Sequence, residues 1–306
     1  MENSSTLQEN ATHALTIRSR LSESILWTFI LSTILGFSFF LCFVTLVLNV
    51  FFKTPILREN ARYVLFVFLL LNDTLYLFIG FCLMVASIYL LHSPVPLCYI
   101  LYAFSSSAFK VTPYNLAAMA LEQYVAICHP LRHKQLCTTQ RANVVFTTIC
   151  FLAMIPCAAD LYLMASSKTG MFSLYVICRQ ENLVFNPIQN VLRSITLIVC
   201  FTSVAIVIIS TYVKIMQVAK RLSPLSSSAS KAGKTVMIHA FQLLLCTSSL
   251  LSILTQEFPI AWPEFFPTIH FFFFTCVPRF LSPLIYGIRD ELLSRYIKKS
   301  LSRYIS

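Results

Sequence analysis

A few ionisable side chains lie inside long apolar stretches of this sequence, and they are its best candidates for chemistry. They are Asp73, Lys110, Glu122, Arg193 and Arg279. If such a stretch crosses a membrane, each buried charge costs about 2.5–3.5 kcal/mol, so each one needs a partner or a function. Opposite charges among them favour buried ion pairs, whereas an unpaired cation favours the binding of an anionic ligand.

The residue pattern gives little support to catalysis or to metal binding. The six His residues are scattered along the chain, and no pair of Cys residues has zinc-site spacing with His. A metal-dependent hydrolase would need His and acidic residues clustered within the apolar stretches. We therefore predict no enzyme activity, no metal and no cofactor.

The composition is too apolar for a water-soluble protein of 306 residues. Hydrophobic residues make up 57% of the chain and charged residues 11%, and the mean hydropathy is +0.75. Ordinary soluble domains have about 25% charged residues. The same composition excludes disordered, collagen-like and coiled-coil chains. It predicts a protein that crosses a membrane several times.

Seven stretches are long and apolar enough to cross about 30 Å of hydrocarbon as helices, which takes roughly 20 residues each. They cover 25–52, 63–91, 97–128, 142–164, 187–213, 235–256 and 265–288. Residues 289–306 put apolar side chains on one helical face and basic ones on the other, which is typical of a helix lying on anionic membrane lipid. We expect an all-α membrane protein, with a tail at 1–24, a seven-helix bundle at 25–288 and a short amphipathic C-terminal helix.

The basic residues predict the orientation of the chain. The net charge is +11, and most Lys and Arg fall in the first, third and fifth predicted loops and in the C-terminal segment. The positive-inside rule places these segments in the cytosol and the N-terminus outside. Residues 1–24 lack the apolar core of a signal peptide and carry glycosylation motifs at Asn3 and Asn10. The basic charge is thus explained by topology, without binding to nucleic acid.

Three motifs resemble those of olfactory receptors, a branch of the rhodopsin-like G-protein-coupled receptors. Residues 119–133 read MALEQYVAICHPLRH and are similar to the end of their third helix. Residues 231–235 (KAGKT) with 239–243 (HAFQL) resemble the start of the sixth helix in fish-type odorant receptors, and 278–287 (PRFLSPLIYG) resemble the end of the seventh. The resemblance implies a plasma-membrane receptor that binds a small odorant from outside. It also implies a heterotrimeric G protein of the stimulatory, olfactory type, and hence cAMP.

The resemblance also assigns residues to the extracellular half. It implies a disulfide between Cys98 and Cys178 and a ligand site among the third, fifth, sixth and seventh helices. Two cations near one small site favour an anionic ligand; alternatively Lys110 bonds backbone carbonyls and Arg193 reaches the lipid headgroups. By position the ligand-site residues are Ser105, Ser106, Phe109, Lys110, Arg193, Thr247, Leu250 and Leu254, and the first four lie on one helical face.

Further residues match the family's polar core and its activation motifs. We expect a buried Asp73–Arg279 ion pair, although each side chain could instead hydrogen-bond to backbone or water. If paired, Arg279 fills the space in which relatives hold a sodium ion, so we expect no regulation by sodium. Gln123 replaces the family's usual Arg, and a neutral amide cannot form its ion pair with Glu122, although a weaker hydrogen bond is open to it. The replacement loosens the resting state and also removes a contact with the G protein; of these opposing effects we expect the second to dominate and to reduce signalling. The polar core comprises Asn49, Asp73, Arg279 and Ser282, and the activation positions are Glu122, Gln123, Tyr124, Tyr212, His239 and Tyr286.

Other classes of membrane protein fit the sequence less well. The runner-up is a non-olfactory rhodopsin-like receptor for a small ligand that could be anionic, but His239 and the sixth-helix motif favour an odorant receptor. A transporter would show discontinuous helices and an internal repeat, and neither is visible. A retinal pigment would need a Lys in the seventh span, and residues 265–288 contain none.

Overall fold

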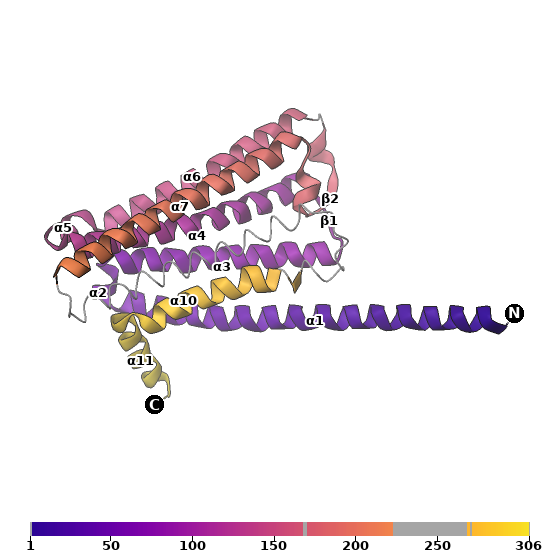
Figure 1. Cartoon of the computed structure of the whole chain (residues 1–306), viewed down its shortest axis with the longest axis horizontal. Coiled ribbons are helices and arrows are strands. Elements are labelled where there is room, and N and C mark those ends of the chain that lie inside the picture. The colour runs from indigo at the N-terminus through magenta and orange to yellow at the C-terminus, as the bar shows by residue number, and fades with distance from the viewer. Residues whose placement is uncertain (1, 168–169, 223–267, 270, 306) are drawn as a thin grey trace.

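The computed structural model is a bundle of long helices with a small β-hairpin at one end (Figure 1). It describes residues 2–167, 170–222, 268–269 and 271–305. The helices of the bundle are α1 (Glu2–Lys53), α3 (Ala61–Ile88), α4 (Val95–Cys128), α6 (Thr139–Ser167), α7 (Pro187–Leu222) and α10 (Val277–Arg289), the last preceded by a π-helical segment, Phe271–Cys276. The other elements are α2 (Pro55–Arg58), β1 (His92–Pro94), α5 (Pro130–Leu136), β2 (Tyr175–Ile177), α11 (Glu291–Ile305) and the 3-10 turns Met171–Ser173 and Gln180–Leu183.

The predicted spans agree with these helices wherever the structure describes the chain. Four of the described helices, α1, α3, α6 and α7, are long and apolar enough to cross a membrane. Helix α4 is also long enough, but Lys110, Glu122 and several hydroxyl side chains make it less apolar. The seventh predicted span corresponds to the π-helical segment and α10, and the sixth, 235–256, lies outside the described residues.

Helix α4 is the centre of the described bundle. It packs against α3, α6 and α7, so polar residues on different sides of α4 meet different neighbours. The largest apolar core joins α1, α3 and α4 through side chains that are almost completely buried, among them Phe40, Phe66, Leu70, Leu116 and Met119. This core holds α3 and α4 in fixed register, which positions the polar residues that they carry.

Helix α1 begins earlier than the apolar stretch does. The sequence changes from polar to apolar near residue 25, but the helix already begins at Glu2. Residues 1–24 contain neither Gly nor Pro, so nothing in this segment interrupts helical hydrogen bonding. In Figure 1 the N-terminal part of α1 extends past the ends of the neighbouring helices. The change in polarity therefore marks the predicted span, not the start of the helix.

A disulfide ties the β-hairpin to the central helix. Strands β1 and β2 pair antiparallel, with His92 opposite Ile177. Cys98 in the first turns of α4 is bonded to Cys178, which directly follows β2, and their Cα atoms lie 5.4 Å apart. The bond confirms the disulfide expected from the family resemblance. It closes 80 residues of chain and fixes the segment after α6 over one end of the bundle.

The C-terminal helix α11 packs partly on the bundle itself. Asp290 caps it by accepting a hydrogen bond from the Leu293 N–H at 2.9 Å, and the Tyr63 hydroxyl donates to the same carboxylate oxygen at 2.9 Å. Leu293 is buried in the main core, and Tyr296 packs against it, while Lys298 is exposed. The amphipathic helix is confirmed, but much of its apolar face covers the protein and not lipid.

Candidate functional site

A buried ion pair between Asp73 of α3 and Arg279 of α10 lies in the middle of the bundle, as predicted. The Thr112 hydroxyl of α4 donates to Asp73 Oδ1 at 2.7 Å and accepts from Arg279 Nη1 at 2.9 Å. The Arg279 guanidinium also lies 3.8 Å from the centre of the Tyr76 ring. Because both charges are compensated and further hydrogen-bonded, the pair is tolerated at this depth and joins three helices.

Two side chains that the sequence analysis passed over complete this polar core. Thr112 bridges the ion pair, and the Asn72 amide donates to Thr112 Oγ1 at 3.0 Å and to the Ala108 carbonyl at 2.9 Å. Their only signal in the sequence is a polar side chain within an apolar run. Of the other predicted members, Asn49 is half-buried on α1, and Ser282 lies on α10 but its side chain is outside the described part.

Lys110 is a buried cation without a carboxylate partner among the described residues. Its exposed fraction is 6%. Nζ donates to Ser106 Oγ at 3.1 Å, one helical turn earlier, and lies 3.8 Å from Cys157 Sγ of α6. No backbone carbonyl of the described residues accepts a hydrogen bond from Nζ. Neither of these two partners carries a carboxylate.

Arg193 of α7 has a partner that the sequence analysis did not foresee. Asp160 of α6 accepts two hydrogen bonds from it, from Nε to Oδ1 at 3.0 Å and from Nη2 to Oδ2 at 2.8 Å. Gln189 also donates to Asp160 Oδ1 at 3.2 Å, and the guanidinium lies 4.8 Å from the Tyr102 ring centre. The expectation of two uncompensated cations was wrong, because one of them is neutralised within the chain. Arg193 Nη1 is buried and has no partner among the described atoms.

The predicted ligand residues of α4 meet two different neighbours. Lys110 contacts α6 through Cys157, and Ser106 accepts a hydrogen bond from Lys110. Phe109 packs against Cys200 and Phe201 of α7 and lies 5.7 Å from the Arg279 guanidinium, measured from the ring centre. The remaining predicted α4 residue, Ser105, is half-buried, and Thr247, Leu250 and Leu254 lie outside the described residues.

At the opposite end of the bundle, Glu122 has two partners from other elements. The acid is 5% exposed; Arg62 Nε, from the start of α3, donates to its Oε2 at 2.9 Å, and His133 Nε2 of α5 lies 2.8 Å from its Oε1. Between the two described side chains Gln123 and Glu122 there is no hydrogen bond. A cation thus reaches Glu122 from α3, in place of the arginine that the neighbouring position lacks.

The other predicted activation residues lie near this end or outside the described part. The Tyr124 hydroxyl is 3.4 Å from His129 Nε2, and the Lys214 ammonium lies 5.5 Å from the Tyr124 ring centre. Tyr212 is exposed on α7. The side chain of Tyr286 is not among those described, and His239 falls in residues 223–267, which lie outside the description.

Cys137, in the turn between α5 and α6, joins the Glu122 and His133 cluster. One ligand atom from each of the three residues lies within 4.8 Å of the others. Burial raises the pKa of the Cys137 thiol above its ordinary value, and the nearby Glu122 carboxylate raises it further, against the smaller opposing effects of Arg141 and Arg62. The thiol is therefore protonated at neutral pH.

A comparison with known protein families identifies the family to which this chain belongs. Residues 25–286 match the family described as "7 transmembrane receptor (rhodopsin family)". The chain belongs to this family. The seven-transmembrane, all-helical fold class is thereby confirmed. Members of this family are receptors and not enzymes.

The most similar relatives include olfactory receptors, which confirms the resemblance seen in the motifs. Odorant receptor 131-2 of Danio rerio is 29% identical over 207 residues, which cover 66% of this chain and 64% of the relative. Olfactory receptor 6K3 of Homo sapiens is 24% identical, and the match covers 60% of this chain and 57% of the relative. Olfactory receptor 14A16 of Homo sapiens is 25% identical, and the match covers 58% of this chain and 59% of the relative. In each case the match spans less than two thirds of the relative.

Proposed function

We propose that this rhodopsin-family receptor is an odorant receptor of the plasma membrane. It binds a small ligand from the extracellular side and activates a heterotrimeric G protein of the stimulatory, olfactory type, which raises cAMP. The motifs of the third, sixth and seventh helices support this proposal, as do the printed names of the relatives. The structural observation that carries it is Lys110, a buried cation that no carboxylate of the described residues neutralises.

The proposed orientation puts the hairpin end of the bundle outside the cell. Elements α2, α5 and α11 lie at the other end, and they carry many of the basic residues that the positive-inside rule assigns to the cytosol (Figure 1). The Cys98–Cys178 bond lies at the hairpin end, where an oxidising exterior would preserve it. Asn3 and Asn10 are then extracellular glycosylation sites, and α11 faces the inner leaflet with its exposed lysines.

The proposed ligand carries an acidic group that binds Lys110. A buried ammonium with only neutral partners is costly, and an anion is the group that compensates it best. Ser106 offers a hydroxyl beside the ammonium, and the unpartnered Nη1 of Arg193 is a further donor near the hairpin end. A small carboxylate or sulfate fits this set of donors better than an amine does.

The ligand site adjoins the polar core through α4. Phe109 and Lys110 directly precede the segment that carries Thr112, the bridge between Asp73 and Arg279. A ligand that favours one arrangement of α4 over another would therefore change the polar core as well, and so shift the receptor from its inactive to its active state. Because Arg279 already compensates Asp73, we expect no sodium dependence of this shift.

A panel of odorants, tested on cells that express the receptor with a cAMP reporter, tests the proposed function. The panel contains amino acids, bile acids, amines and steroids, and cells without the receptor are the control. We expect a concentration-dependent rise in cAMP, strongest for an acidic compound. A ligand that acts only through another second messenger would contradict the proposed coupling. Activation by a hormone-like amine alone would favour the non-olfactory alternative.

A further inference from the structure

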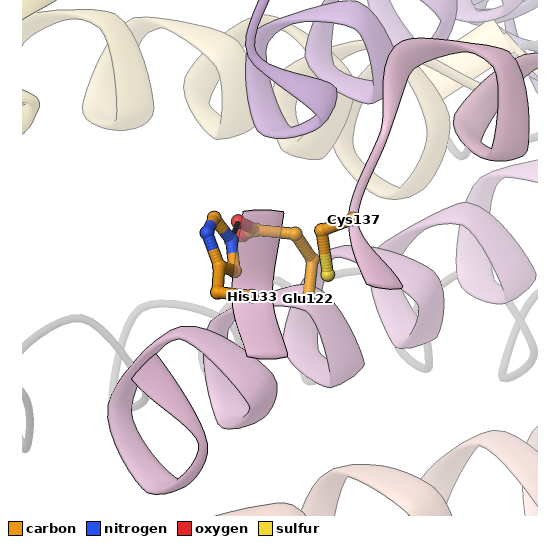
Figure 2. A group of neighbouring side chains, drawn as sticks. All are labelled: Glu122, His133 and Cys137. Atoms are coloured by element: carbon orange, nitrogen blue, oxygen red, sulfur yellow. Dashed lines mark hydrogen bonds and ion pairs between the residues drawn. The ribbon is translucent and has the colours of Figure 1, made fainter. Parts of the chain in front are cut away.

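Three potential metal ligands meet at the end of the bundle opposite the hairpin. Glu122 lies near the end of α4, His133 on α5, and Cys137 directly after α5, and in Figure 2 the Glu122 side chain lies between the other two. Their ligand atoms all lie within 4.8 Å of one another. The sequence spacing does not reveal this group, since the turn at His129 folds α5 back beside the acid.

The distances suit a zinc ion after small side-chain movements. Zinc binds sulfur at about 2.3 Å and nitrogen or oxygen at about 2.0–2.2 Å, so tetrahedral ligand atoms lie roughly 3.3–3.8 Å apart. Closing a separation of 4.8 Å to this range takes shifts of about 1 Å, which rotamer changes can supply. The mixture of thiolate, imidazole and carboxylate favours Zn²⁺ over Mg²⁺ or Ca²⁺, which prefer oxygen alone.

The surroundings of Glu122 already hold its carboxylate in place. Arg62 binds Oε2 at 2.9 Å, while Oε1 faces His133 at 2.8 Å. An ion could take the place of the hydrogen bond between Oε1 and the imidazole while Arg62 keeps the other oxygen fixed, as outer partners of metal ligands commonly do. His133 and Cys137 are half-buried, so an ion can reach them from solvent.

We propose that Glu122, His133 and Cys137 form a binding site for a Zn²⁺ ion, whose fourth position is open to water. The thiol loses its proton to solvent when the ion binds, and no group is oxidised or reduced. The ion would tie the end of α4, next to Gln123, to the segment between α5 and α6. This site is separate from the ligand site around Lys110, and binding of the ion does not depend on the proposed odorant function.

Cobalt binding to the purified, reduced full-length receptor in lipid nanodiscs tests the site. Co²⁺ bound to a thiolate gives charge-transfer and visible absorption bands, and added Zn²⁺ should remove them. We expect Cys137→Ser and His133→Gln each to lower the affinity for Zn²⁺, measured by its competition with Co²⁺, at least about tenfold. Replacing a residue that only hydrogen-bonds to a metal ligand already causes a loss of this size. The matched variants Cys128→Ser and His129→Gln, which lie at the same end outside the cluster, should leave affinity within about twofold. Absence of the bands, or equal losses in the matched variants, would overturn the proposal.

A second measurement avoids variants altogether. The rate at which a maleimide modifies Cys137 in membranes is measured by mass spectrometry, with and without Zn²⁺, and Cys128 in the same sample is the internal standard. We expect Zn²⁺ to slow modification of Cys137 at least about tenfold while Cys128 changes little, because the bound thiolate is no longer free to react. An unchanged rate at Cys137 would contradict the site. Neither experiment uses an agonist, so its failure leaves the odorant proposal standing.

Discussion

Thr112 shows how this receptor keeps a charge pair in the centre of its bundle. Its hydroxyl donates to Asp73 and accepts from Arg279, so one neutral side chain bonds both members of the pair. The pair itself could be predicted, because both charges lie in apolar spans and match the family's polar core. The bridge could not be predicted, since many Ser and Thr residues in these helices bond only to their own backbone, as Thr74 does.

Removing one member of this pair should destabilise the receptor strongly. Arg279→Met leaves the Asp73 carboxylate buried and uncompensated, which typically costs about 3–5 kcal/mol. We expect a clearly lower melting temperature of the detergent-solubilised receptor and less receptor at the cell surface. Adding Asp73→Asn to the same variant should recover part of the loss, because no charge then remains. A stable single variant, or a double variant less stable than the single one, would contradict the ion pair.

Gln123 offers a residue-scale test of the activation motif. Glu122 is already bonded by Arg62 and His133, so an arginine introduced at 123 would be left to meet the G protein. We expect Gln123→Arg to raise the maximal cAMP response at matched surface expression. Gln123→Met, which adds no charge, is the control and should not raise it. An unchanged or lower maximum in the arginine variant would show that Gln123 does not limit signalling.

The ion pair between Arg62 of α3 and Glu122 of α4 supplies the cation that position 123 lacks. Arg62 lies at the second residue of α3, behind the Asn60 cap, and reaches the Glu122 carboxylate of α4. In the sequence, Arg62 is one of the basic residues of the first predicted loop, and nothing indicates that it pairs with Glu122, 60 residues later. Such pairs depend on how two helices align, which spacing along one helix does not reveal. The same reason explains why the Asp160–Arg193 pair between α6 and α7 was missed.

Breaking this tie should raise activity without agonist. Arg62→Gln removes a charged bond to the nearly buried Glu122, leaves His133 as its partner and loosens α4 against α3. We expect basal cAMP to rise severalfold at equal surface expression. The matched variant Arg58→Gln removes an exposed cation one turn before α3 and should leave basal cAMP unchanged. Equal basal levels in both variants would argue against a role for the tie.

The hairpin element depends on its disulfide. Cys178→Ser releases the segment after β2 from the start of α4, so the hairpin can no longer be held over the bundle. We expect surface delivery to fall to background, and Cys98→Ser to do the same. Cys42→Ser, which replaces an exposed free cysteine of α1, is the control and should reach the surface normally. Normal delivery of Cys178→Ser with an intact ligand response would show that the bond is dispensable.

At the scale of the whole molecule, the sequence predicted the helices well and their mutual contacts poorly. Apolar length located α3, α4, α6 and the start of α7 within a few residues, because about 20 apolar residues are needed for any span, whereas α7 continues to Leu222, beyond the predicted end at 213. The same pattern could not show that α1 begins at Glu2, or that Leu293 of α11 packs into the core. Nor could it show that α5 folds His133 back onto Glu122. These features depend on tertiary packing, not on local polarity.

The central claim is that an acidic ligand binds at Lys110 and drives cAMP production. The most direct test compares concentration–response curves of an acidic agonist and its neutral amide on the wild type, Lys110→Met and the exposed control Lys298→Met. Loss of a buried charge partner costs about 2–5 kcal/mol, so we expect the acid to lose roughly 30-fold or more in potency on Lys110→Met alone. The amide should be weak on the wild type and change little. Equal potency of the acid on wild type and Lys110→Met, at matched surface expression, would contradict the account.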